Sequence, residues 1–134
     1  MALTDALLAS LLGWTILNGG FGQPGPVPMP PVVFTEMPRQ EIAGLYDRET
    51  ATVQLERDCE TRFTSRCRSI LVHELVHHLY VVTGQPRKCH QDEEKTAYLT
   101  QYKWLLENAP AVLGSVALDP ITFIFATECM EENY

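Results

Sequence analysis

The run SILVHELVHHLYVVTG, residues 69 to 84, constrains this chain most, because it places two histidines and a glutamate among aliphatic side chains. Leucine, isoleucine and valine surround His73, Glu74 and His77 on nearly every side, so a helix formed here should lie at the centre of the fold. Burying an ionised carboxylate and two imidazoles without partners is expensive in free energy. The run therefore predicts a buried helix whose polar groups have a dedicated binding partner.

The spacing of these three residues indicates what that partner is. His73, Glu74 and His77 form the pattern HExxH, which on a helix puts the two imidazoles on one face, roughly 6 Å apart along the axis. This arrangement can bind a single zinc ion, and Glu74 beside it is suited to accept a proton from a zinc-bound water. The motif predicts Zn²⁺ as cofactor, His73 and His77 as ligands and Glu74 as the catalytic base.

A catalytic zinc site needs a third protein ligand and an open position for water. The stretch HQDEEKTAYLTQYKW, residues 90 to 104, supplies two candidates. Glu94 shares a helical face with Ala97 and Tyr98, and the small Ala97 lets this helix approach the histidine helix closely. Glu93 competes as ligand, and both glutamates also fit simple stabilisation of a helix N-terminus. The sequence favours Glu94 and leaves Glu93 open.

Capping residues and β-rich runs predict an α+β domain spanning residues 1–134. The expected helices run from Thr4 to Asn18, from Thr64 or Ser65 to Gly84, from about Asp92 to Asn108, and onward from Asp119. Runs at 32–35 and 51–56, with a strand and turn between them, predict a small antiparallel sheet. Residues 19–31 are rich in glycine and proline and should form an extended connector. We expect an N-terminal helix, this sheet, the HExxH helix and two further helices.

Composition excludes two classes of partner. The net charge of -7 disfavours binding to nucleic acid, because such proteins carry a concentrated basic face. No apolar run is long enough to span a bilayer. Nothing in the sequence indicates an oligomeric state.

Four cysteines without a CxxC pair favour disulfides, with reduced buried thiols as the alternative. Helices that alternate in direction would bring Cys59 to Cys67 and Cys89 to Cys129. Disulfides indicate an oxidising, extracytoplasmic compartment, either periplasmic or secreted. The N-terminal stretch contains an aspartate and no Lys or Arg, so we expect it to belong to the mature fold, any export signal having been removed.

Residues 40–108 resemble the zincin metallopeptidases of the gluzincin type. HELVHH followed by EEKTAY is similar to their metal motif, and AGLYDRETATVQLE to the strand pair that precedes it. The resemblance extends to small bacterial zincin-like proteins. It implies that His73, His77 and Glu94 bind zinc, that Glu74 is the base, and that a peptide or protein substrate lies along an edge strand.

Two alternatives to a metallopeptidase are a zinc-binding interaction or scaffold module, and a metal-free core in which Glu74 pairs with Arg or Lys. Other residues near the motif have secondary interpretations. His78 should point away from the metal, whereas Tyr80, His90 and Tyr98 are candidates to donate a hydrogen bond in the transition state, or are ordinary core and rim residues.

Overall fold

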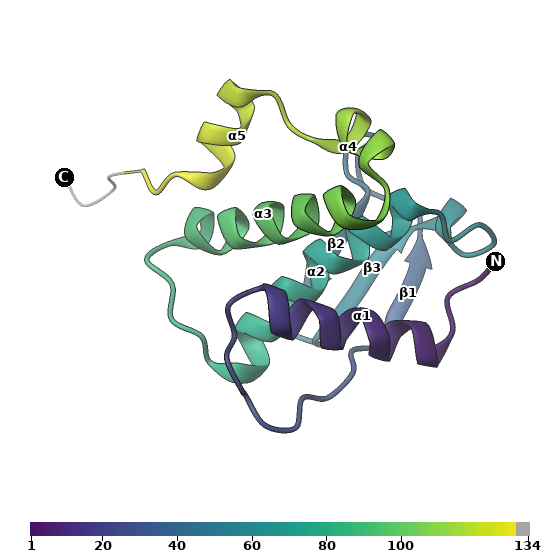
Figure 1. The fold of residues 1–134 in the computed structure, drawn as a ribbon, viewed down its shortest axis with the longest axis horizontal. Coiled ribbons are helices and arrows are strands. Elements are labelled where there is room, and N and C mark those ends of the chain that lie inside the picture. The colour runs from purple at the N-terminus through teal and green to yellow at the C-terminus, as the bar shows by residue number, and fades with distance from the viewer. Residues whose placement is uncertain (131–134) are drawn as a thin grey trace.

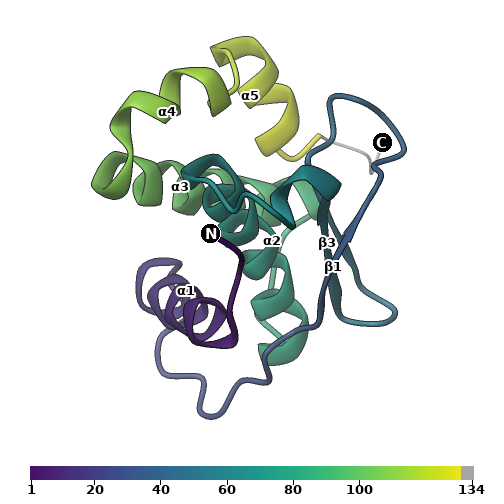
Figure 2. The ribbon, with the colours of Figure 1, turned by 90° about the vertical axis from the view of Figure 1, so that its right-hand side faces the viewer.

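The computed structural model describes residues 1–130, which form an α+β fold of five α-helices and a three-stranded sheet (Figure 1). The helix that contains HExxH, α2 (Ser65–Thr83), lies at the centre, with the sheet on one side and α1 and α3 against its other faces (Figures 1 and 2). The predicted fold class is confirmed.

Helix α2 has the boundaries that its caps predict. The Thr64 side chain accepts the Cys67 backbone N–H at 3.2 Å, and Gly84 ends the helix in the left-handed conformation, with φ 69°. Every side chain from Ser69 to Tyr80 is buried. The prediction of a buried central helix is therefore confirmed, and its polar side chains must find their partners inside the protein.

The sheet differs from the predicted antiparallel arrangement. Its order is β1 (Val32–Thr35), β3 (Thr52–Glu56), β2 (Gly44–Asp47), with β2 antiparallel to β3 and β1 parallel to β3. The antiparallel prediction is thus correct for the β2–β3 hairpin and wrong for β1. The β-rich pattern of a strand does not indicate which strand it will pair with or in which direction. Here residues 36–43 connect β1 to β2 across the sheet, and β3 pairs between these two strands. As a result β2 has a free edge.

The remaining helices include one that the sequence did not predict. Helix α1 (Asp5–Asn18) begins at the predicted Thr4 cap. Helix α3 (His90–Asn108) begins two residues before Asp92, because Cys89 caps it. Pro110 does not simply end α3: it occupies the first turn of α4 (Pro110–Val116), where the missing N–H costs nothing. With α5 (Pro120–Thr127), three helices rather than two follow α2.

Both predicted disulfides are present. Cys59 joins Cys67, which ties the short 3₁₀ turn η1 (Arg57–Cys59) to the start of α2, and Cys89 joins Cys129, which ties the segment after α5 to the start of α3. Such bonds persist in oxidising environments.

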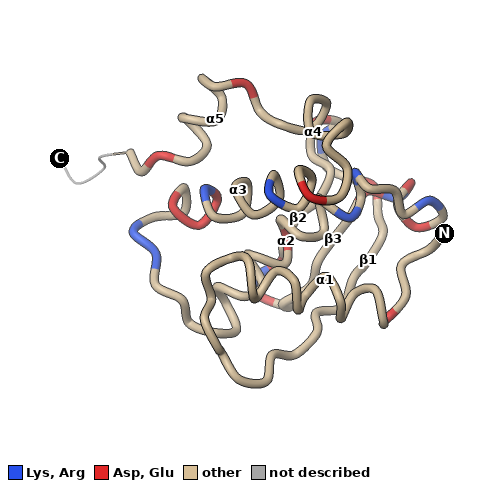
Figure 3. The backbone as a smooth tube through the Cα atoms, viewed as in Figure 1, with Lys and Arg blue, Asp and Glu red and all other residues tan. Residues whose placement is uncertain are grey.

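Charged residues are unevenly distributed along the chain (Figure 3). Residues 6–35, which include most of α1 and the connector, contain none, whereas the start of α3 is densely charged. In the described part of the chain no single helix is long and apolar enough to cross a membrane; α4 and α5 reach that hydropathy only as a pair bent by 76°.

Candidate metal centre

Helices α2 and α3 bring three potential ligands to one point. The Nε2 atoms of His73 and His77 lie 2.9 and 2.8 Å from Oε1 of Glu94. One ligand atom from each of the three residues lies within 4.8 Å of the others. The structure therefore brings together the three residues that the sequence favoured as ligands.

Each imidazole is oriented by a hydrogen bond at its other nitrogen. Nδ1–H of His73 donates to the Gln101 side-chain oxygen at 2.9 Å, and the Gln101 amide group donates to Ser69 Oγ at 3.3 Å. Nδ1–H of His77 donates to Glu93 at 2.5 Å. Because both Nδ1 atoms are occupied, both Nε2 atoms face Glu94, and such partners normally fix the orientation and basicity of metal-binding histidines.

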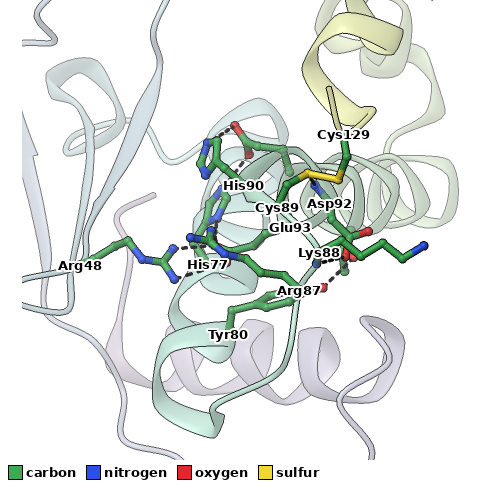
Figure 4. A network of polar contacts seen from close by, with 12 residues as sticks. Arg48, His77, Tyr80, Arg87, Lys88, Cys89, His90, Asp92, Glu93 and Cys129 are labelled. Carbon is green, nitrogen blue, oxygen red and sulfur yellow. Dashed lines mark hydrogen bonds and ion pairs between the residues drawn. A yellow bond between two sulfur atoms is a disulfide. The ribbon is translucent and has the colours of Figure 1, made fainter. Parts of the chain in front are cut away.

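Glu93 has a role that the sequence did not reveal. Its side chain is 0% exposed, and besides His77 it binds Arg48 at 2.7 Å and Arg87 at 3.0 Å (Figure 4). Burial alone would raise the pKa of Glu93, but the hydrogen bonds from His77 and Arg48 stabilise the carboxylate more strongly and lower the pKa to about 2. Glu93 thus contacts His77 at the nitrogen that faces away from Glu94, as an anion held by three donors.

Glu74 lies at the edge of the same site. It is 6% exposed, and burial raises the pKa of its carboxyl, an effect that His73 and His77 partly oppose. A Cβ added to Gly44 would lie 3.1 Å from Oε2 of Glu74, so strand β2 passes directly beside this carboxyl. Among residues 1–130 Glu74 has no Arg or Lys partner, in contrast to the pair expected of a metal-free core.

The donor set fits a zinc ion. Two imidazole nitrogens and a carboxylate oxygen are the usual protein ligands of a catalytic zinc, and with bonds of about 2.05 Å their tetrahedral spacing is roughly 3.3 Å, about half an ångström wider than here. Burial opposes protonation of His77, but its bonds to Glu93 and Glu94 raise the pKa to about 10. Burial would raise the pKa of Glu94, but the hydrogen bonds from His73 and His77 outweigh it and hold this pKa well below its usual range. In the absence of a metal, the protonated imidazole of His77 therefore balances the negative charge of the Glu94 carboxylate.

The three candidate ligands face a pocket of about 540 Å³, within the range of small-molecule sites. Helix α2 forms its floor. Residues 41–46 form one wall, and α3 with residues 115–118 forms the other. The candidate metal site is therefore accessible from outside the protein.

Of the other candidate residues near the motif, His78 and Tyr80 do not line the pocket. His78 points away from the metal site, as predicted: its Nε2–H donates to the Pro28 carbonyl at 2.7 Å, and its Nδ1 accepts from Tyr46 at 2.8 Å. Tyr80 hydrogen-bonds Thr96 at 3.0 Å and does not line the pocket.

His90 and Tyr98 do line the pocket. His90 is 3.9 Å from Glu94 and largely exposed. The ring of Tyr98 packs edge-on against His73 with centroids 4.5 Å apart, and burial, followed by the charge of Glu94, raises its pKa to about 12. Tyr98 therefore remains a neutral phenol, able to donate a hydrogen bond into the pocket.

Comparison with protein families gives a match to a domain of unknown function, DUF6647, over residues 33–134. The chain belongs to the DUF6647 family. The DUF6647 match begins in β1 and includes every ligand candidate and its hydrogen-bond partners, but not α1. No curated protein and no solved structure matches the chain.

Proposed function

We propose that this DUF6647 protein is a zinc-dependent hydrolase, a metallopeptidase of the gluzincin type that cleaves peptide bonds. One observation carries the proposal: two imidazole nitrogens and a carboxylate oxygen converge at the floor of an open pocket, beside a buried glutamate that has no Arg or Lys partner among residues 1–130. Zinc bound there would activate a water molecule and polarise the substrate carbonyl.

The protein residues have separate tasks in this mechanism. His73, His77 and Glu94 hold the ion, while Gln101 and Glu93 keep the imidazoles in the orientation that binds it. Glu74 accepts the proton of the attacking water and then delivers it to the leaving amine nitrogen. A raised carboxyl pKa suits a group that must both take up and release a proton near neutral pH.

The free edge of β2 is suited to bind the peptide backbone. The Ala43 carbonyl accepts from Glu56 N–H at 2.9 Å, so Ala43 pairs with β3. Because partners alternate along an antiparallel strand, the N–H and C=O groups of Gly44 and Tyr46 point to the opposite, free edge. A substrate added there as an extra strand would pass directly beside Glu74. Two disulfides further support an extracytoplasmic, oxidising location for this activity.

The Glu74→Gln variant tests the assignment of base. It should retain about one zinc per chain and lose hydrolysis of a quenched fluorescent peptide pool by ~100-fold or more, the usual size of a general-base contribution. Glu107→Gln, at the exposed end of α3, is the matched control and should keep wild-type activity. Undiminished hydrolysis by Glu74→Gln would refute the role of Glu74. Zinc binding by a wild-type protein that cleaves nothing would favour the interaction or scaffold module.

A further inference from the structure

The pocket has a basic end, on the His77 side of the candidate metal site (Figure 4). Arg48 follows strand β2 directly and lines the pocket there. Its guanidinium donates to Oε2 of Glu93 at 2.7 Å, and the same carboxylate oxygen accepts from Nδ1–H of His77. Arg48 is therefore held at a fixed position, one carboxylate away from a candidate metal ligand.

Positive charge is in excess at this end of the pocket. Arg87 donates to the other oxygen of Glu93 at 3.0 Å, so two guanidinium groups share one carboxylate. Among residues 1–130 neither arginine has a second acidic partner within ion-pair distance. The other arginine that lines the pocket, Arg66, is paired one to one with Glu56. One positive charge thus remains uncompensated beside the pocket, although the whole chain carries a net charge of -7.

Arg48 also has hydrogen-bond donors left for a ligand. A guanidinium carries five N–H groups, of which Glu93 accepts two from Arg48. The Arg48 side chain is 42% exposed, so a ligand in the pocket can reach it. His90 lines the same end, with its ring stacked on that of His77 at a centroid distance of 6.3 Å. A carboxylate matches such a site, because its two oxygens accept side by side from the planar guanidinium.

We propose that Arg48 binds a carboxylate group of the substrate at this end of the pocket. The inference rests on the proposed peptidase function and specifies its substrate class: peptides that place an acidic side chain or their free terminal carboxylate beside Arg48. Hydrogen bonds between charged groups are among the stronger ones, but partial exposure of Arg48 screens this pair. The carboxylate should therefore raise affinity by about 10-fold at low salt.

Two-ended compounds test the proposal without turnover. Each compound joins a hydroxamate, which chelates zinc, to a carboxylate through a methylene chain, and the chain length increases along the series. Calorimetry on the zinc-loaded protein compares each carboxylate with the carboxamide of the same length. At the length that spans from the metal to Arg48, the carboxylate should bind about 10-fold more tightly, and added salt should reduce this advantage. Equal affinities at every length, or no binding of any compound, would overturn the proposal.

Two arginine variants separate a direct contact from an indirect effect through Glu93. Arg48→Gln should abolish the preference for the carboxylate at every chain length. Arg87→Gln is the matched control, because Arg87 binds the same Glu93 carboxylate but does not line the pocket, and it should keep the preference. Both compounds of a pair bind through the same hydroxamate, so their affinity ratio is insensitive to a general loss of zinc affinity. A preference that persists in Arg48→Gln, or is lost equally in Arg87→Gln, contradicts the assignment.

Peptide cleavage by the wild-type protein distinguishes the two sources of the carboxylate. Enrichment of Asp or Glu at one position near the cleaved bond identifies an acidic side chain. Cleavage that is lost when the peptide C-terminus is amidated identifies the terminal carboxylate. Cleavage with neither dependence overturns the carboxylate site and leaves the peptidase function standing. A preference for the carboxylate compound without cleavage of any peptide removes the peptidase function and leaves the carboxylate site standing.

Discussion

The Glu93→Gln variant tests whether the buried carboxylate behind His77 supports the metal site. The change keeps the shape of the side chain and removes its charge. Glu93 is 0% exposed and accepts from His77, Arg48 and Arg87, so all three donors lose an ionic partner at once. The substituted side chain would also present an amide group that donates rather than accepts.

The structure sets the size of the effect. Breaking a buried ion pair by removing one partner costs about 3–5 kcal/mol. Here the side chains of Arg48 and Arg87 are 42% and 34% exposed, so water can solvate both after the change. We therefore expect a loss of about 2–3 kcal/mol in the free energy of unfolding, at or just below the lower limit of that range. Zinc affinity should fall by about 10–100-fold, because Nδ1 of His77 loses its orienting partner.

Urea denaturation of the metal-free protein measures the first quantity, and competition with a chromogenic chelator measures the second. Glu107→Gln is the control, because its amide oxygen can still accept from Trp14 Nε1, which lies 3.3 Å away. It should change stability by less than about 0.5 kcal/mol. Wild-type zinc affinity in Glu93→Gln would refute the claim that Glu93 orients His77.

Three further predictions concern pH, packing and the cross-link. The pKa of His77 is raised from 6.5 to about 10 without metal, so its contribution to stability is complete below pH 6.5 and is lost as pH rises toward 10. Zinc must displace that proton, so zinc affinity should instead rise over the same interval; a flat titration by chelator competition would contradict this. Gly44→Ala should lower the free energy of unfolding by about 1–3 kcal/mol, because the new methyl group would lie 2.7 Å from Ile70 Cγ2; an unchanged urea midpoint would show that β2 shifts freely. Replacing Cys89 and Cys129 together by alanine should cost about 4 kcal/mol by the loop-entropy relation, since 40 positions separate them, and a loss below about 1 kcal/mol would mean that the cross-link adds little.

Local signals in the sequence predicted most of the helices and the candidate ligands. Thr4, Thr64 and Asp119 each cap a helix at the predicted position, because capping depends on residues only three apart. The HExxH spacing likewise fixes the relation of His73 to His77 through helical geometry alone. These features needed no knowledge of the tertiary structure.

Features that depend on distant parts of the chain could not be predicted in the same way. The parallel pairing of β1 with β3 depends on how residues 36–43 cross the sheet. Arg48 and Glu93 are 45 positions apart, and nothing local distinguishes their charges from those of solvated residues. Helix α4 was missed because Pro110 signals both the end of one helix and the first turn of another.

The metal content of the purified protein shows whether His73, His77 and Glu94 bind zinc. Protein purified without added metal and without a histidine tag would be analysed for metals by elemental analysis at a known protein concentration. The convergence of His73, His77 and Glu94 predicts about one zinc per chain, lost in the His73→Ala variant. Absence of zinc from the wild-type protein, even after reconstitution with micromolar metal, would contradict the account and leave both histidines as residues of an ordinary polar core.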